Sequence, residues 1–307
     1  MRTTWPRLVA ALVSILAATF VSSAIAAGPV VQVVEISDHR ARFDNGNPAV
    51  VRYMLIDPAN ADPALDGFPP LNTRAVLMLF TGGDGRLALA PGQQNIASPN
   101  FLVRARYHFA AEGYVVAIVD AASDFLVHNH QVEDDAQGFP HASGLRGHRL
   151  PGRLHGDKHL QDLEAVMNSL RARYPSLPLW AVGTSRGTVS AALAGVAVTQ
   201  PADGVVLTSS LTGPDPFEDL NGVNLAAINA PVLIATHQGD ACAGTHPNDS
   251  KALRSRFPGS PRVQVLLFNG GSAPLTDPCD PLSPHGYFGV EQRVIDAITR
   301  WIGSRGK

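Results

Sequence analysis

The chain of 307 residues has little charge and few aromatic side chains, and both shortages limit what it can do. Charged residues make up 16% of the sequence and aromatic residues 7%, and the formal net charge is −2. Because no run of Lys and Arg provides the positive surface that nucleic acids need, no nucleic acid is expected as a partner. The low aromatic content also argues against a broad stacking platform for bases or sugars.

Collagen-like repeats, sustained heptads and a series of membrane-length apolar runs are also missing. The hydrophobic share of 45% is instead enough for a large buried core. Such a composition is too apolar for a disordered chain. The sequence therefore predicts a globular protein.

Residues 1–26 have the pattern of a secretory signal peptide. Arg2 and Arg7 give a positive start, an uncharged apolar run covers residues 8–21, and small residues follow in the A-x-A positions. This run is shorter than the roughly 20 residues that cross a bilayer, which disfavours the alternative of an uncleaved anchor. We expect cleavage after this segment, a mature chain of residues 27–307 without a membrane span, and a secreted or periplasmic location.

Cysteine is scarce, and the two that occur are Cys242 and Cys279. In an oxidising compartment such a pair usually forms a disulfide, and two buried free thiols are the alternative. The bridge would close a loop of 37 residues. The chain-entropy model assigns about 4 kcal/mol of stabilisation to a loop of this length.

Short apolar segments alternate with helical patterns along the chain. Strands are expected at 30–36, 50–56, 75–80, 114–119, 179–182, 205–208, 232–236 and 263–268, and helices at 101–111, 159–173, 186–198, 248–257 and 290–302. Because buried strands separated by helices form βαβ units, we predict an α/β fold. It would be a single domain with a mostly parallel central sheet and helices on both faces. The first two strands should form an antiparallel hairpin at the sheet edge.

Two longer stretches interrupt this alternation, at residues 121–157 and 210–229. The first is rich in Gly, Pro and His, and the second contains Pro214, Pro216 and Gly222. Both are long for ordinary connections and both follow strands, where α/β sheets place their ligand sites. We therefore expect lid-like insertions that form walls of a pocket.

The motif Gly183-Thr184-Ser185-Arg186-Gly187 matches G-x-S-x-G and lies between an expected strand and an expected helix. A serine on such a tight turn is held in a strained conformation with its hydroxyl exposed at the sheet edge. The flanking glycines are needed because a Cβ would collide with the neighbouring helix or strand. The Arg186 N–H, at the start of the helix, would point toward a developing oxyanion. Ser185 is therefore the candidate nucleophile.

A serine nucleophile needs a base and an acid that orients the base. Asp240 follows the expected strand at 232–236, and His285 follows the one at 263–268. They come after the serine in the order acid, then histidine. Asp215 or Asp219 could replace the acid, and His237 is the nearby rival for the base, although it precedes the acid.

The second donor of an oxyanion hole usually comes from the loop after an earlier strand, here Thr81 to Gly85. We expect the N–H of Gly83 in this role, with Gly82 or Asp84 as the alternatives. The two cysteines lie two residues after the candidate acid and six before the candidate base. A disulfide would therefore connect the acid loop to the base loop.

With these residues the chain resembles the α/β-hydrolase superfamily over roughly residues 30–302, and secreted bacterial hydrolases with a Gly-Thr-Ser-Arg-Gly elbow in particular. The resemblance implies that Ser185, Asp240 and His285 are nucleophile, acid and base. The chain departs from lipases and esterases with a His-Gly-Gly-Gly loop because Phe80-Thr81 precede its glycines. It also lacks the aromatic residue beside the nucleophile of cutinase-like enzymes. These departures leave the identity of the substrate open but do not change the expected chemistry.

A histidine-rich stretch supports a competing interpretation, a hydrolytic zinc site. It contains six histidines within 32 positions, namely His128, His130, His141, His148, His155 and His159. The H-E-x-x-H pattern fails because Gly156 stands where the glutamate should be. We therefore expect a polar lid, and neither a metal nor a cofactor.

The sequence thus predicts a serine hydrolase that cleaves small-molecule carboxylic esters through an acyl-enzyme. An amidase or peptidase with the same triad is the main alternative, because the acyl-transfer chemistry is shared. A metal-dependent hydrolase and a non-catalytic binding module on this fold are the others. The Arg186 side chain could in addition pair with a substrate carboxylate, if it faces the pocket.

Overall fold

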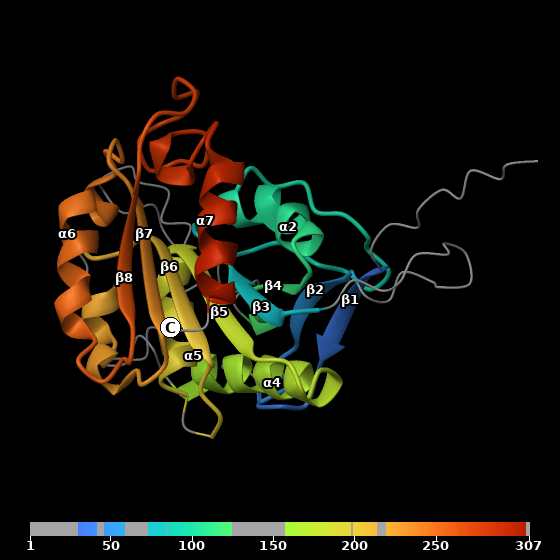
Figure 1. Ribbon diagram of the computed structural model, residues 1–307. Helices are drawn as coiled ribbons and strands as arrows, with labels where there is room; N and C mark the ends of the chain where they lie inside the picture. The colour runs from blue at the N-terminus through green and yellow to red at the C-terminus, as the bar shows by residue number, and fades with distance from the viewer. Residues whose placement is uncertain are drawn as a thin grey trace, which may run out of the picture.

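Eight strands hydrogen-bond into one sheet in the computed structural model, which describes residues 30–41, 46–58, 73–83, 85–124, 157–197, 199–213 and 219–304. The sheet order is β1-β2-β4-β3-β5-β6-β7-β8 (Figure 1). The strands are β1 Val30–Ile36, β2 Val51–Asp57, β3 Ala75–Phe80, β4 Tyr114–Val119, β5 Leu179–Ser185, β6 Gly204–Ser210, β7 Val232–His237 and β8 Val263–Phe268.

Strands β3 to β8 run parallel to one another, whereas β2 is antiparallel to both β1 and β4. The expected edge hairpin and the mostly parallel sheet are therefore confirmed. Because parallel strands end at the same edge, the loops after β3, β5, β7 and β8 all emerge on one side of the sheet. Ser185 ends β5 at this edge, and Gly83, Asp240 and His285 lie in the loops after β3, β7 and β8.

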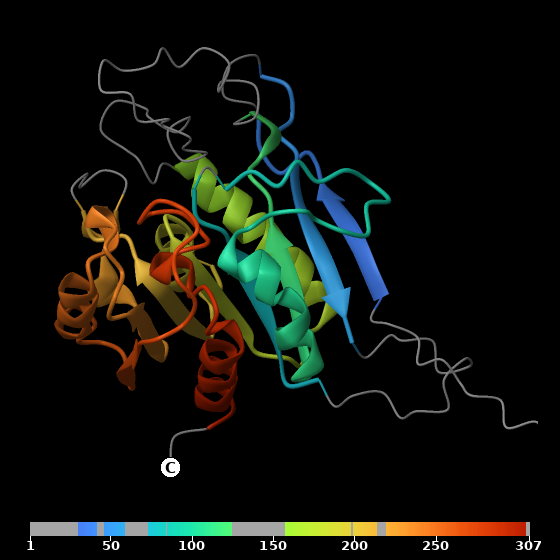
Figure 2. The ribbon, with the colours of Figure 1, turned by 90° about the horizontal axis from the view of Figure 1, so that it is seen from above.

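Helices cover both faces of the sheet, as expected (Figures 1 and 2). The described helices are α2 Phe101–Ala111, α4 Asp157–Arg173, α5 Gly187–Gly195, α6 Pro247–Ala252 and α7 Glu291–Gly303. Along β3, side chains alternate between the faces: Val76 and Met78 join the core beneath α4 and α5, whereas Leu77 and Leu79 join the core beneath α2 and α7. Both faces of this strand are buried, which explains its fully apolar sequence.

Three elements end three or more residues away from their expected bounds, and the others differ by two residues or fewer at either end. Strand β5 continues to Ser185, because its last residues still pair with β6, where Ser185 faces Ser210 across an irregularity in register. Helix α5 ends at Gly195, before the expected end at 198. The helix expected at 248–257 is divided into α6 and the 3₁₀ turn η5, Leu253–Arg256, whose tighter winding is common where helices end.

The two long stretches are described only in part. Of the first, residues 121–124 and the start of α4 are described; of the second, 211–213 and 219–229, which contain the 3₁₀ turns η2 Leu220–Gly222 and η3 Leu225–Ala227. The segment expected to be a signal peptide lies outside the described residues. No helix that the structure describes is long and apolar enough to cross a membrane.

Candidate active site

Ser185 is the last residue of β5 and has a left-handed backbone conformation, with φ of 53°. A non-glycine residue at positive φ is strained, and such strain is typical of functional positions. The Thr188 hydroxyl donates to the Ser185 carbonyl at 2.6 Å and accepts from the N–H of Leu211 at 3.2 Å. The turn is thus held by the first residues of α5 and by the end of β6.

The two glycines of the motif lie where the strand and the helix touch. A Cβ on Gly183 would come within 2.2 Å of the Gly187 carbonyl oxygen, and one on Gly187 within 2.2 Å of the Phe80 carbonyl oxygen. No side chain fits against backbone at such distances. The expectation that both positions require glycine is consistent with this packing.

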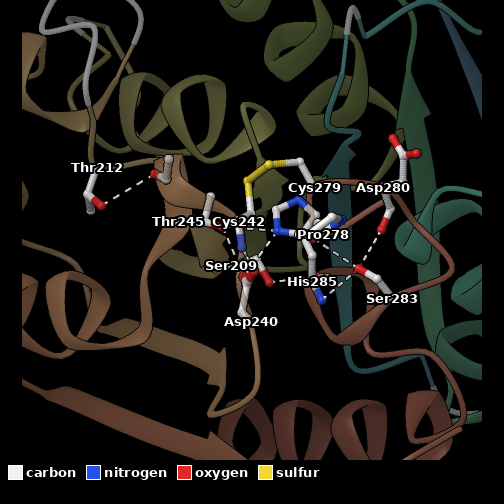
Figure 3. The surroundings of a disulfide bond; sticks show 11 residues. Ser209, Thr212, Asp240, Cys242, Thr245, Pro278, Cys279, Asp280, Ser283 and His285 are labelled. Carbon is white, nitrogen blue, oxygen red and sulfur yellow. Dashed lines mark hydrogen bonds and ion pairs between the residues drawn. A yellow bond between two sulfur atoms is a disulfide. The ribbon is translucent and has the colours of Figure 1, made fainter. Parts of the chain in front are cut away.

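His285 and Asp240, which are 45 positions apart, meet in the interior. The distance from Nδ1 of His285 to Oδ2 of Asp240 is 3.1 Å. His285 lies in the 3₁₀ turn η6, Pro284–Gly286, and is 5% exposed, while Asp240 is 3% exposed. The N–H of Cys242 donates to Oδ1 of Asp240 at 3.0 Å, so both carboxylate oxygens have partners (Figure 3). This arrangement can fix the tautomer and the orientation of the imidazole.

Thr245 contacts both members of this pair and was not anticipated from the sequence. It is fully buried, and its hydroxyl donates to Oδ2 of Asp240 at 2.9 Å and lies 3.0 Å from Nδ1 of His285 (Figure 3). The three groups form a closed triangle in which one hydroxyl contacts both the acid and the base. The residue ends η4, Ala243–Thr245, in the loop that begins at the acid.

Ser209 and Tyr287, which were also not anticipated, form hydrogen bonds that fix the segment around His285. The Ser209 hydroxyl donates to the His285 carbonyl at 2.7 Å, and the Ser209 N–H donates to the Tyr287 hydroxyl at 3.1 Å. Tyr287 in turn donates to the Ala235 carbonyl at 2.8 Å. Ser209 in β6 and Tyr287, which follows η6, both have positive φ, 44° and 57°, so the backbone is strained on both sides of this contact. The buried Tyr287 ring packs against Phe101.

A pocket of about 190 Å³ opens onto the candidate nucleophile and base. Ser185, His285, Gly82 and Gly83 all contribute to its lining. No hydrogen bond joins the Ser185 hydroxyl to His285, although the structure describes both residues. Such contacts are often long without a substrate and shorten when one binds.

The loop after β3 brings two of the three expected oxyanion donors to this pocket. A Cβ on Gly82 would lie 2.9 Å from the Cβ of Ser185, so this backbone approaches the serine closely. Gly83 has φ of +68° and lines the same pocket. Arg186 precedes the first residue of α5 as its N-cap. Asp84, the third alternative, lies outside the described residues.

The disulfide between Cys242 and Cys279 is present, with Cα atoms 4.6 Å apart. Figure 3 shows it beside the pair formed by Asp240 and His285. Cys279 also lines the pocket of the candidate nucleophile. The bridge therefore connects the loop that carries the acid to the segment before the base, as expected.

The alternative residues lie elsewhere or outside the described chain. Asp219 caps η2 by accepting from the N–H of Asn221 at 2.7 Å, and Asp215 lies outside the described residues. The His237 ring contacts the Gly270 carbonyl at 2.9 Å and the Gly239 N–H at 3.0 Å. The structure therefore pairs neither Asp219 nor His237 with the other candidates.

The histidine-rich stretch falls largely outside the described residues, and of its six histidines only His159 is described. Its ring lies 2.9 Å from the Ser190 hydroxyl, and burial lowers the pKa of His159 to about 4. Within the described ranges no three His, Cys, Asp or Glu side chains are grouped as metal ligands.

Comparisons with known proteins identify the fold. A soluble variant of monoglyceride lipase from Saccharomyces cerevisiae is similar, with a TM-score of 0.54 and 13% identity over 92% of this chain and 98% of that one. A cold-adapted esterase from an Arctic intertidal metagenomic library has a TM-score of 0.53 and 15% identity, over 88% of this chain and 94% of the esterase. Dienelactone hydrolase from Anabaena variabilis has a TM-score of 0.51 and 12% identity, over 88% of this chain and 96% of that one.

No protein-family model matches the chain, and no curated protein matches its sequence. Identities of 12–15% show the fold alone. The chain therefore has the α/β-hydrolase fold, which the sequence predicted. Fold alone does not assign an activity, so function must be argued from the site.

Proposed function

We propose that this protein is a serine hydrolase that cleaves carboxylic esters through an acyl-enzyme on Ser185. The observation that carries the proposal is the strained serine in one pocket with an imidazole whose Nδ1 faces a buried carboxylate. Similar solved structures include an esterase and a lipase, which is consistent with this chemistry.

In the first half of the reaction the Ser185 hydroxyl attacks the ester carbonyl and its proton passes to Nε2 of His285. Asp240 keeps the Nδ1–H in place and stabilises the imidazolium. The negative oxygen is held by the N–H of Arg186 and, in our proposal, that of Gly83, with Gly82 as the alternative donor. His285 then gives its proton to the departing alcohol oxygen, and the acyl group remains on the serine.

In the second half a water molecule gives a proton to His285 and its oxygen attacks the acyl-enzyme. The carboxylic acid leaves as the proton returns to the serine. Neither half requires a redox partner, and every proton is carried by the imidazole. An amide could follow the same path, so an amidase or peptidase remains the alternative.

The test is hydrolysis of p-nitrophenyl butanoate by the purified mature chain and by Ser185→Ala, with matching anilides for the alternative. We expect ester turnover that falls by several powers of ten in the variant, because a triad acts as a unit. A fluorophosphonate probe should label the wild type alone. Equal turnover by the two proteins, or labelling of the variant, would refute the assignment.

We further propose that residues 1–26 are a cleaved signal peptide and that the mature chain works outside the cytoplasm. The disulfide supports this location, because such bridges persist in oxidising compartments. Mass spectrometry of the N-terminus after export tests the expected cleavage after residue 26.

A further inference from the structure

A second pocket lies against the first, on the other side of the loop after β3. Thr81 and Gly83 line both pockets, and Arg186, the residue after the candidate nucleophile, lines the second. The walls of the second pocket are mostly apolar and come from the ends of β2, β3 and β4 and from α4, with Val51, Phe80, Val119, Ala122 and Leu163. A substrate carbonyl at Ser185 would therefore have the pocket of the serine and histidine on one side and a mostly apolar pocket nearby.

The position of the general acid in the proposed reaction indicates which part of the ester each cavity receives. His285 must protonate the departing alcohol oxygen, so the alcohol must lie on the side of the imidazole. His285 lines the first pocket, of about 190 Å³, and the second pocket is lined by other residues. The group on the opposite side of the carbonyl is the acyl chain. The second pocket borders Gly83 and Arg186, whose N–H groups hold the carbonyl oxygen in the proposed mechanism.

Taking the proposed esterase function as given, we infer that the second pocket is the acyl subsite and that it admits short aliphatic acyl chains. The volume available to water-sized groups in this pocket is about 50 Å³. Because one such group needs roughly 10–15 Å³, the cavity holds roughly three to five non-hydrogen atoms beyond the carbonyl. Butanoyl to hexanoyl chains meet this limit, and a decanoyl chain exceeds it.

The acidic group of the pocket that lies on α4 is paired with a cation of the protein. The Asp162 carboxylate receives two hydrogen bonds from the Arg40 guanidinium, both at 2.7 Å, and a third contact from His39 at 2.5 Å. His159 contacts the Ser190 hydroxyl, and its low pKa keeps the ring neutral at neutral pH. Arg186 is a further cation in this lining, so the pocket selects acyl chains by length and not by charge.

Leu163 offers a direct test, because it lines the pocket from α4 and is 1% exposed. Leu163→Ala lengthens the cavity. Leu170→Ala is the matched control, since this leucine lies two turns further along the same helix, is 0% exposed and belongs to the same core without lining the pocket. Both variants lose the same side-chain atoms from buried positions of one helix, so each should lose a few kcal/mol of stability. Only Leu163→Ala alters the pocket lining.

The experiment measures kcat/KM for p-nitrophenyl butanoate and decanoate. We expect wild type and Leu170→Ala to prefer butanoate at least tenfold, and Leu163→Ala to reduce that ratio to about threefold or less. A second series, butanoate esters of methanol to octanol followed by pH-stat, should be unaltered in Leu163→Ala. If that variant folds poorly, Ala122→Leu fills the pocket instead and should lower the ratio of butanoate to acetate turnover at least tenfold.

An unchanged acyl preference in a folded Leu163→Ala protein would overturn the inference, and so would a change confined to the alcohol series. Both of those results leave ester hydrolysis by Ser185 intact. Absence of ester turnover in the wild type, or its survival in Ser185→Ala, would instead contradict the proposed function, and the acyl subsite with it.

Discussion

The main-chain N–H of Cys242 donates a hydrogen bond to the Asp240 carboxylate at 3.0 Å, so the residue that forms the disulfide also holds the candidate acid. Its partner Cys279 lies six residues before His285 and lines the same pocket as the serine. The bridge therefore acts on both members of the acid–base pair through one covalent bond.

Removal of this bridge should lower both stability and turnover. For the double variant Cys242→Ser and Cys279→Ser we expect the free energy of unfolding to fall by about 4 kcal/mol, the loop-closure value for 37 residues. The value of kcat should fall about tenfold, because the acid and base loops can separate. Urea denaturation and p-nitrophenyl butanoate kinetics measure the two effects. Reductant should reproduce them in the wild type and do nothing further to the variant.

The hydroxyl of Thr245 should matter for turnover more than for substrate binding. In Thr245→Val a group of similar shape replaces it, so Asp240 loses a donor and the Nδ1–H of His285 loses a second acceptor. We expect kcat to fall roughly tenfold with KM unchanged, because the imidazole is less firmly oriented in the transition state. Thr245→Ser keeps the hydroxyl and should restore kcat. A loss of kcat in Thr245→Ser with none in Thr245→Val would show that the shape of the side chain counts and the hydroxyl does not.

Much of the fold could be predicted because it depends on local patterns. Strands such as β3 and β4 are fully apolar and buried on both faces, so their bounds agree with the expectation residue for residue. The serine turn could be located because Gly183 and Gly187 are required by contacts within a few residues of Ser185 and with the neighbouring strand.

The supporting hydroxyls could not be predicted, because their partners are distant in sequence. Thr245 reaches His285 across 40 positions and Ser209 reaches it across 76. Thr and Ser are common in loops, and nothing local marks these two. One signal was available for Thr245, which follows Asp240 by five residues in the same loop, but only the packed structure turns its hydroxyl toward both partners.

Loss of the Tyr287 hydroxyl should loosen the histidine loop. In Tyr287→Phe the buried carbonyl of Ala235 and N–H of Ser209 lose their partner. Leaving two such groups unpaired should cost about 2–3 kcal/mol of unfolding free energy. We expect kcat to fall as well, since Ser209 also donates to the His285 carbonyl. Tyr107→Phe on the exposed side of α2 is the control and should alter neither quantity.

The partly buried ring of His159 should make the folded protein sensitive to mild acid. Burial lowers its pKa from 6.5 to about 4, so the unfolded chain takes up a proton near pH 6.5 that the folded chain refuses until about pH 4. Stability must therefore fall as the pH drops through this window, because the unfolded state binds more protons. Between pH 7 and pH 4.5 the loss should be roughly 2 kcal/mol after allowance for partial solvent access.

Urea denaturation at the two pH values measures this loss. His159→Gln carries no titrating ring and should lose less stability on acidification than the wild type, whereas His108→Gln on the exposed side of α2 should behave like the wild type. Burial raises the pKa of Asp120, which acts in the opposite direction but equally in all three proteins. The comparison between variants therefore isolates the imidazole. If His159→Gln loses as much stability as the wild type, the folded ring takes up its proton in the same pH range as the unfolded one. The acyl pocket beside it would then carry a positive charge at pH 4.5.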